Sequence, residues 1–286
     1  MPAIINTNIN SLNAQRNTSS AQLSLSTSMQ RLSSGLRVNS AKDDSAGLAI
    51  AERMQAQVRG MNVAVRNAND GISLAQTAEG AMGKVSDSLQ RMRELAVQSR
   101  NATNTSADKT SLDKEFGELA KEIQRVLGGT TFNGRTILAG ADAGTQTFQV
   151  GANTSTNDVV DVVTTDMTAN TDIKAVAGDD NTGANRAVIT GDTAALKTVI
   201  DNIDKAINTV NGERATLGAS QNRFDAVISN LQVSVENQSA ARSRIMDADY
   251  ASETASLSRA QILQQAGNAM IAQANQMPQQ VLSLLR

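Results

Sequence analysis

Apolar residues recur at every seventh position through residues 44–99, a stretch that contains no proline. A companion row lies four positions after each member in the first half and three positions after it in the second half. The main row is Met54, Met61, Ala68, Ala75, Met82, Leu89 and Ala96, and the companion row is Val58, Val65, Ile72, Ala78, Val85 and Met92. This spacing predicts one amphipathic helix, roughly 80 Å long, packed along other helices.

Two further helices are predicted to pack against this one. Residues 106–127 have one apolar face, and Gly128 is expected to be their C-cap. Residues 192–244 repeat the seven-residue pattern, with the row Leu196, Ile203, Val210, Leu217, Phe224 and Leu231. Because the two long helices are nearly equal in length, we expect them to lie antiparallel. The short helix would then cover the second half of the first one.

The helical period gives way to alternation in the middle of the chain. Asn133-Gly134 between alternating residues predicts a β-hairpin, because this dipeptide suits the tight turn of a hairpin. Residues 146–150 and 158–163 are further strand candidates. Residues 164–190 have little pattern and are expected to be loop-like and exposed.

Short breaks separate the long helices from the two ends of the chain. Gly35 and the two serines before it are poor helix formers, and residues 247–250 are a second break. Ser40 or Asp43 is expected to cap the first long helix, where acidic side chains suit the positive end of the helix dipole.

Both ends are predicted to be helices that need a partner. The apolar stripe near the N-terminus is too thin to hold a lone helix in water, and the C-terminal segment is apolar and nearly uncharged. We therefore expect residues 1–40 and 250–286 to be disordered in the monomer and helical in a polymer. The residues expected to pack in that polymer, called the terminal seam, are Ile5, Ile9, Leu12, Leu263, Met270, Met277, Val281 and Leu284.

The expected fold class is therefore mainly α. It is a long antiparallel bundle or coiled-coil rod with a small β-hairpin region and helical termini. Residues 1–40 and 250–286 would form one discontinuous terminal polymerisation domain. Residues 41–163 and 191–249 would form a rod-like helical domain with β-hairpins. Residues 164–190 would be a short variable exposed segment.

Composition removes most chemical functions. The chain has no His and no Cys, so the commonest general base, the commonest metal ligand and every thiol are missing. We therefore expect no enzyme activity, metal or cofactor. A net charge of −2 indicates no attraction to nucleic acid or to an anionic membrane. No apolar run is long enough to span a membrane, and no secretory signal peptide is expected.

Several motifs occur in order along the two end regions. They are Ile4-Ile5-Asn6-Thr7-Asn8, RLSSGLRVNSAKDD at 31–44, LQRMRELAVQ at 89–98, Phe132-Asn133-Gly134, FQVGAN at 148–153, and residues 279–286. With them, residues 1–163 and 191–286 resemble the bacterial flagellins, the subunits of the flagellar filament. Many flagellins carry large outer domains in the middle, where this chain has a short segment.

The resemblance implies a function and a set of partners. It implies export through the flagellar type III channel, without a cleaved signal peptide, to the flagellum outside the cell. It implies polymerisation of the chain with itself under a cap protein, to form a filament for motility. It also implies contact with hook-associated junction proteins and with an export chaperone that binds the C-terminal segment.

The resemblance also implies recognition by hosts. In flagellins detected by the flagellin-sensing Toll-like receptor, residues matching Gln90, Arg91, Leu95 and Glu115 form the contact, and the same surface packs between subunits. From the spacing alone this surface is a solvated helix face with Leu95 at its border, where Asp87 and Arg91 are positioned to pair.

Two alternatives remain open from the sequence. A hook–filament junction protein resembles flagellin at its ends, but the strength of the 89–98 motif argues against it. An intracellular coiled-coil scaffold would be a stable soluble dimer with ordered ends. A flagellin would instead be a monomer that forms long polymers.

Overall fold

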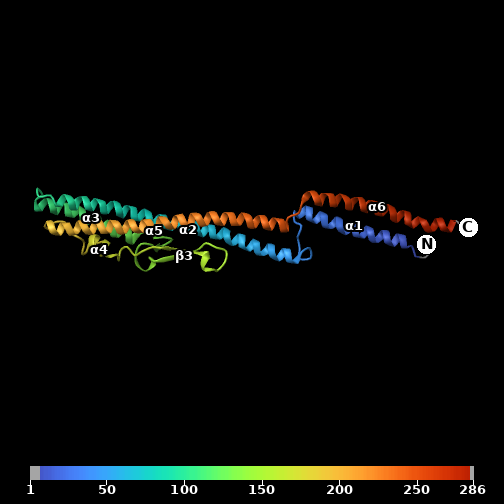
Figure 1. The fold of residues 1–286 in the computed structure, drawn as a ribbon, viewed down its shortest axis with the longest axis horizontal. Coiled ribbons are helices and arrows are strands. Elements are labelled where there is room, and N and C mark those ends of the chain that lie inside the picture. The colour runs from blue at the N-terminus through green and yellow to red at the C-terminus, as the bar shows by residue number, and fades with distance from the viewer. Residues whose placement is uncertain (1–6, 284–286) are drawn as a thin grey trace. The chain divides into compact units, whose positions relative to one another are not determined.

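The structure is a computed structural model that describes residues 7–283, and side chains for residues 7–277 (Figure 1). The backbone forms two units, Gln57–Val235 and the combination of Met1–Ala56 with Glu236–Arg286, here called unit 2 and unit 1. The mainly α class is confirmed, with two small antiparallel sheets. The helices are α1 (Ile9–Ser34), α2 (Ser45–Ser99), α3 (Ser106–Gly129), α4 (Thr171–Ala177), α5 (Thr193–Met246) and α6 (Tyr250–Ser283). The strands are β1 (Thr131–Phe132), β2 (Arg135–Thr136), β3 (Thr145–Gln149) and β4 (Val159–Val163), and short 3-10 turns are η1 (Gly140–Asp142) and η2 (Thr156–Asp158).

In unit 2, the parts of α2 and α5 that belong to it lie antiparallel, as predicted. Arg93 pairs with Asp204 at 2.7 Å, and the side-chain amide of Gln221 donates to Glu79 at 2.9 Å. The main row of α2 from Met61 onward and the predicted row of α5 are buried. They comprise Met61, Ala68, Ala75, Met82, Leu89 and Ala96 on α2, and Leu196, Ile203, Val210, Leu217, Phe224 and Leu231 on α5.

Helix α3 packs along the second half of α2, also as predicted. A capping box between Thr105 and Asp108 satisfies the first turn of α3. The predicted C-cap at Gly128 is wrong, because α3 continues through Gly129 and ends at Thr130. Thr130 leaves the helix in an extended conformation that leads into β1, and its hydroxyl donates to the Val126 carbonyl at 2.6 Å. No left-handed residue is therefore needed there.

The predicted hairpin and strands are confirmed. Asn133 and Gly134 join β1 to β2 with φ of 50° and 80°, the left-handed pair that a type I′ turn requires. Strands β3 and β4 pair antiparallel. Phe148 of β3 meets Phe224 of α5 edge to face, with ring centroids 5.7 Å apart, which joins this sheet to the helical core.

Residues 164–190 are not the exposed loop expected from the sequence. They include α4, which begins at the cap Asn170, and their buried apolar residues are Met167, Ile173, Val176, Ala177 and Ile189. The Arg186 guanidinium pairs with the Asp113 carboxylate of α3 at 2.6 Å. The apolar residues are too few and too scattered to show a period, yet they all belong to the unit 2 core.

In unit 1, α1 and α6 lie antiparallel, side by side (Figure 1). Gly35 ends α1 with φ of 71°, which confirms the predicted break. The next residues join the end of α5, where the Arg37 amide donates to the Met246 carbonyl at 2.6 Å. The expectation that the ends lack structure in the monomer is not met by the described residues, because each helix is the other's partner.

The start of α2 differs in one detail from the prediction. Its cap is Asp44, whose carboxylate accepts the amide of Gly47 at 2.8 Å, and not Ser40 or Asp43. Asp43 instead accepts the amides of Ser40 and Asn39. These bonds favour its charged form and lower the pKa of the Asp43 carboxyl.

Candidate assembly surface

The contact between α1 and α6 is made by small side chains. The residues buried there are Ser11, Ala21, Ser28, Ala260 and Ala274. Gly267 lies so close to Thr18 that a Cβ at position 267 would overlap the Thr18 hydroxyl oxygen. Small residues allow two helix backbones to approach closely, but they bury little apolar area.

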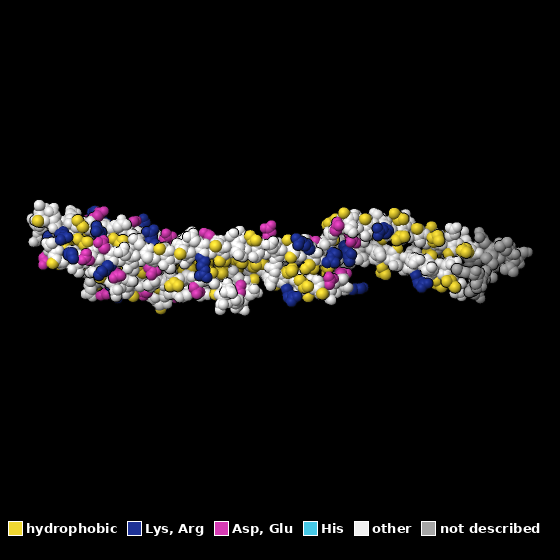
Figure 2. Space-filling model, in the orientation of Figure 1, with side chains coloured by type: hydrophobic (Ala, Val, Ile, Leu, Met, Phe, Trp, Pro, Cys, Tyr) yellow, Lys and Arg dark blue, Asp and Glu magenta, His cyan; other side chains and the backbone are white. Residues whose placement is uncertain are grey.

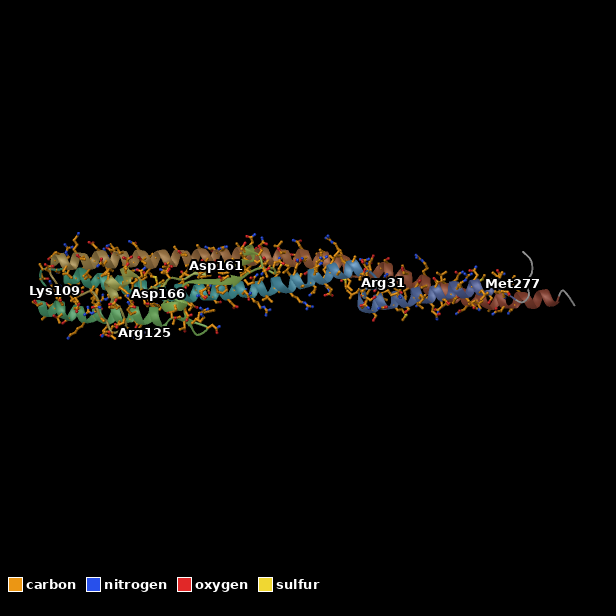
Figure 3. The ribbon with its side chains drawn as sticks, turned by 90° about the horizontal axis from the view of Figure 1, so that it is seen from below. Arg31, Lys109, Arg125, Asp161, Asp166 and Met277 are labelled. Atoms are coloured by element: carbon orange, nitrogen blue, oxygen red, sulfur yellow. The ribbon has the colours of Figure 1, made fainter. Side chains whose placement is uncertain are left out.

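Polar contacts set the register of this helix pair. The Asn8 side-chain amide donates to the Ala274 carbonyl at 2.7 Å, and the Ser11 hydroxyl donates to the Asn275 side chain at 2.8 Å. Toward the other end of α1, where Figure 3 labels Arg31, the guanidinium of Arg31 lies 3.7 Å from the carboxylate of Glu253. The pair is therefore held at both ends by hydrogen bonds and an ion pair.

The large apolar side chains of the same two helices face outward. Leu23 is 72% exposed and Met270 is 61% exposed. Figure 2 shows hydrophobic side chains along the visible face of these helices. The exposed set is Ile9, Leu12, Leu23, Met29, Ile262, Leu263, Met270 and Met277. Exposed apolar side chains gathered in this number mark an interaction surface.

Several of these side chains line two shallow grooves. One, of about 600 Å³, is lined on α1 by Ile9, Leu12 and Leu23. The other, of about 470 Å³, runs between α1 and α6 and is lined by Leu263, Met270 and Met277. Asparagines of α1 form the opposite wall of the second groove. Both grooves are open to solvent in the single chain.

The terminal seam is thus partly visible. Ile9, Leu12, Leu263, Met270 and Met277 are exposed on α1 and α6. Ile5 and Leu284 lie outside the described residues, and so does the side chain of Val281, which belongs to α6. The apolar residues of α6 divide over two faces, since Ala260 and Ala274 are buried against α1. Only the larger side chains remain available to a partner.

The second predicted surface lies on α2 and α3 in unit 2. Arg91 pairs with Glu94 and with Glu115, each at 2.9 Å, and these hydrogen-bonded carboxylates raise the pKa of the Arg91 guanidinium. The expected partner of Arg91, Asp87, instead lies 3.8 Å from Lys84. The structure thus brings Arg91 and Glu115 together on an exposed surface.

Leu95 does not belong to this surface, which corrects the prediction. It is fully buried, although Gln90 and Arg91 on the same helix are exposed. The seven-residue spacing placed Leu95 at the border because it assumes that neighbouring helices cover only one narrow face of α2. Packing of both α3 and α5 against α2 widens that covered stripe, and position 95 falls inside it.

One polar cluster was missed by sequence reasoning. Asp113 of α3 accepts from Arg186 and from the Ile189 amide at 2.9 Å. Burial raises the pKa of the Asp113 carboxyl, but the hydrogen bonds from Arg186 and Ile189 outweigh burial, so its pKa is lowered. Further along α3, the Gln124 side-chain amide donates to the Gly178 carbonyl. The residues concerned are far apart in sequence and form no motif.

Two absences apply to the described part of the chain. Residues 7–283 contain no group of three acidic, His or Cys side chains able to hold a metal ion. No helix in that range is long and apolar enough to cross a membrane.

Long antiparallel helices with outward apolar side chains are the architecture of a structural helical protein. Residues 5–143 match the bacterial flagellin N-terminal helical region, and residues 200–285 match the bacterial flagellin C-terminal helical region. The chain belongs to the bacterial flagellins. It is therefore a structural subunit of the flagellar filament, outside the cell, and its family is not a family of enzymes.

Individual relatives agree with the family match. A flagellin of Halalkalibacterium halodurans is 46% identical over 284 residues, which cover 99% of this chain and 100% of the relative. A flagellin of Xenorhabdus nematophila is 44% identical over 316 aligned positions and is covered completely, as is this chain. The solved structure of a putative flagellar hook-associated protein from Vibrio parahaemolyticus covers 72% of this chain with a TM-score of 0.59. At 14% identity, that likeness shows a shared fold.

Proposed function

We propose that this flagellin polymerises by burying the outward apolar side chains of α1 and α6 against further copies of the chain. The proposal rests on the different residues that these two helices use on their inner and outer faces. Small residues are used for the internal contact, whereas Leu23, Met270 and others remain exposed. Each large side chain contributes about 1.5–3 kcal/mol when it is fully buried, so several per subunit suffice to drive association.

The proposal separates two domains by their tasks. Residues 1–40 with 250–286 would polymerise, and residues 41–163 with 191–249 would fold independently of polymerisation. The proposed boundaries lie near the helix ends at Ser34 and Tyr250, whereas the two compact units divide within α2 and α5, after Ala56 and after Val235. Residues 164–190, folded against α3, would serve the second domain rather than polymerisation.

The test is seeded polymerisation of purified protein, followed by sedimentation and electron microscopy. Met270→Asp should abolish polymer formation, because a charge would have to be buried between subunits. Met270→Leu keeps the size and polarity of the side chain and is the matched control, which should polymerise normally. Circular dichroism must show equal helix content in both variants. Normal polymerisation of Met270→Asp would refute the role of this surface.

Delivery and assembly partners form a further part of the proposal. We infer that the chain leaves the cell through the flagellar type III channel. A cap protein would guide polymerisation, hook-associated proteins would join the filament base, and a chaperone would cover the C-terminal segment until export. A chaperone suits the exposed Leu263 and Met277, which would otherwise promote aggregation inside the cell. Secretion by a flagellated host lacking its own flagellin tests export, with an export-defective host as control.

Host recognition is proposed at Gln90, Arg91 and Glu115, without Leu95. Arg91 offers several directed hydrogen bonds on an exposed surface, which suits a protein–protein hot spot. Monomer should activate a reporter cell that carries the flagellin-sensing Toll-like receptor, and Arg91→Ala should weaken activation. Arg93→Ala is the matched control, because Arg93 pairs with Asp204 of α5 instead. Equal loss in both variants would contradict the assignment.

A further inference from the structure

The methionines of this chain fall into two groups by exposure. The chain has ten. Met29, Met270 and Met277 are each more than half exposed, and all three lie on α1 or α6. Five others are buried, namely Met61, Met82, Met92, Met167 and Met246. Met54 is half-buried, and Met1 lies outside the described residues. Exposed methionine is therefore confined, among the described residues, to the proposed assembly surface.

We propose that Met29, Met270 and Met277 are oxidation sites, and that their oxidation by hydroperoxides stops the free chain from polymerising. The inference rests on the proposed function. A thioether sulfur attacks the outer oxygen of the peroxide, a sulfur–oxygen bond forms and the peroxide bond breaks. The sulfur is oxidised to the sulfoxide, the peroxide is reduced, and the leaving oxygen takes up the proton and departs as water or an alcohol.

The effect on assembly follows from the surroundings of these sulfurs. Met270 and Met277 line the groove between α1 and α6, with Leu263 beside them. A sulfoxide oxygen is a strong hydrogen-bond acceptor, which water satisfies in the single chain. In the groove it faces Asn10 and Asn13 as well as apolar side chains. When a second copy covers the surface, the sulfoxide loses its water, and an oxygen turned toward the apolar side chains of that copy is left without a donor, which is unfavourable.

Whether the three methionines can react depends on whether the oxidant arrives before or after polymerisation. In the single chain the three methionines are exposed to solvent, whereas burial against another copy would shield them. The finished filament should therefore resist the oxidant that disables its subunits. Reversal by a methionine sulfoxide reductase would restore the chain before assembly.

The experiment treats monomer and preformed filament with the same dose of hydrogen peroxide. Peptide mass spectrometry should find oxygen added at Met29, Met270 and Met277 of the monomer before any of the five buried methionines. The three sites should react more slowly in the filament. Oxidised monomer should need about tenfold more protein to polymerise, since one unpaired buried oxygen is sufficient for such a change.

Two triple variants separate oxidation from other damage. Met29→Leu/Met270→Leu/Met277→Leu is compared with itself before and after peroxide treatment, and the treatment should leave its polymerisation unchanged, because leucine cannot be oxidised there and fills a similar volume. Met61→Leu/Met82→Leu/Met92→Leu is the matched control and should remain sensitive. Normal polymerisation of wild type with all three sites oxidised would overturn the proposal, as would equal oxidation of buried and exposed sites. Failure of untreated wild type to polymerise would refute the proposed function instead.

Discussion

Gly71 and Gly80 both lie inside α2, but alanine should have opposite effects at these two positions. Glycine in a helix interior is about 1 kcal/mol less favourable than alanine. A Cβ at position 71 would lie 2.6 Å from Cζ and 2.9 Å from Cε2 of Phe224, whereas a Cβ at position 80 meets nothing within 4 Å. Phe224 is fully buried and meets Phe148 edge to face, so neighbouring groups confine its ring.

The magnitude follows from these contacts. Overpacking a core costs about 1–3 kcal/mol, and the helix gain of about 1 kcal/mol offsets part of it at position 71. Gly71→Ala should therefore lower the free energy of unfolding by about 0–2 kcal/mol, and Gly80→Ala should raise it by up to about 1 kcal/mol. Urea unfolding followed by circular dichroism measures both variants under the same conditions.

A third variant tests the cause of the difference. Phe224→Leu removes the ring edge that a Cβ at position 71 would strike. Combined with it, Gly71→Ala should be neutral or stabilising, and the coupling appears in a double-mutant cycle. If Gly71→Ala is as stable as Gly80→Ala in the wild-type background, the reasoning about close helix packing is refuted.

Three other expectations follow from the structure. Leu95→Ala should lower the free energy of unfolding by about 2–5 kcal/mol, as for a core leucine, whereas Arg91→Ala should leave it nearly unchanged; thermal melts compare the two. The Asp113–Arg186 pair should weaken in acid, because folding lowers the pKa of the Asp113 carboxyl. The contribution of the pair to the free energy of unfolding is therefore full above about pH 4, and it is lost as the pH falls through that lowered pKa. Asp113→Asn should be less stable at neutral pH and less sensitive to acid, and an unchanged acid profile would contradict this. Limited proteolysis should trim both ends to a core near residues 45–245, because α1 and α6 share only small buried residues and should open easily. Equal protease resistance of the ends and the core would contradict this prediction.

Local features of the sequence were sufficient for most of the secondary structure. A seven-residue apolar repeat requires a long helix wherever it continues, and an Asn-Gly pair between alternating residues supplies the left-handed turn of a hairpin. The capping box at Thr105 and the break at Gly35 depend only on neighbouring residues. The composition excluded His and Cys chemistry, but the flagellar function came from motifs that resemble a family rather than from periodicity.

Tertiary packing decided which face of each helix is covered. Leu95 is buried because two helices cover α2 at its level, and a repeat along one helix does not specify how many neighbours it has. In α1 and α6 the small residues face each other and the large ones face outward, contrary to what hydrophobicity alone indicates. The close approach at Gly267 and Thr18 and the hydrogen bonds of Asn8 and Ser11 select that pairing. Such contacts join residues far apart in the chain, so they stabilise the fold only when both helices are in place.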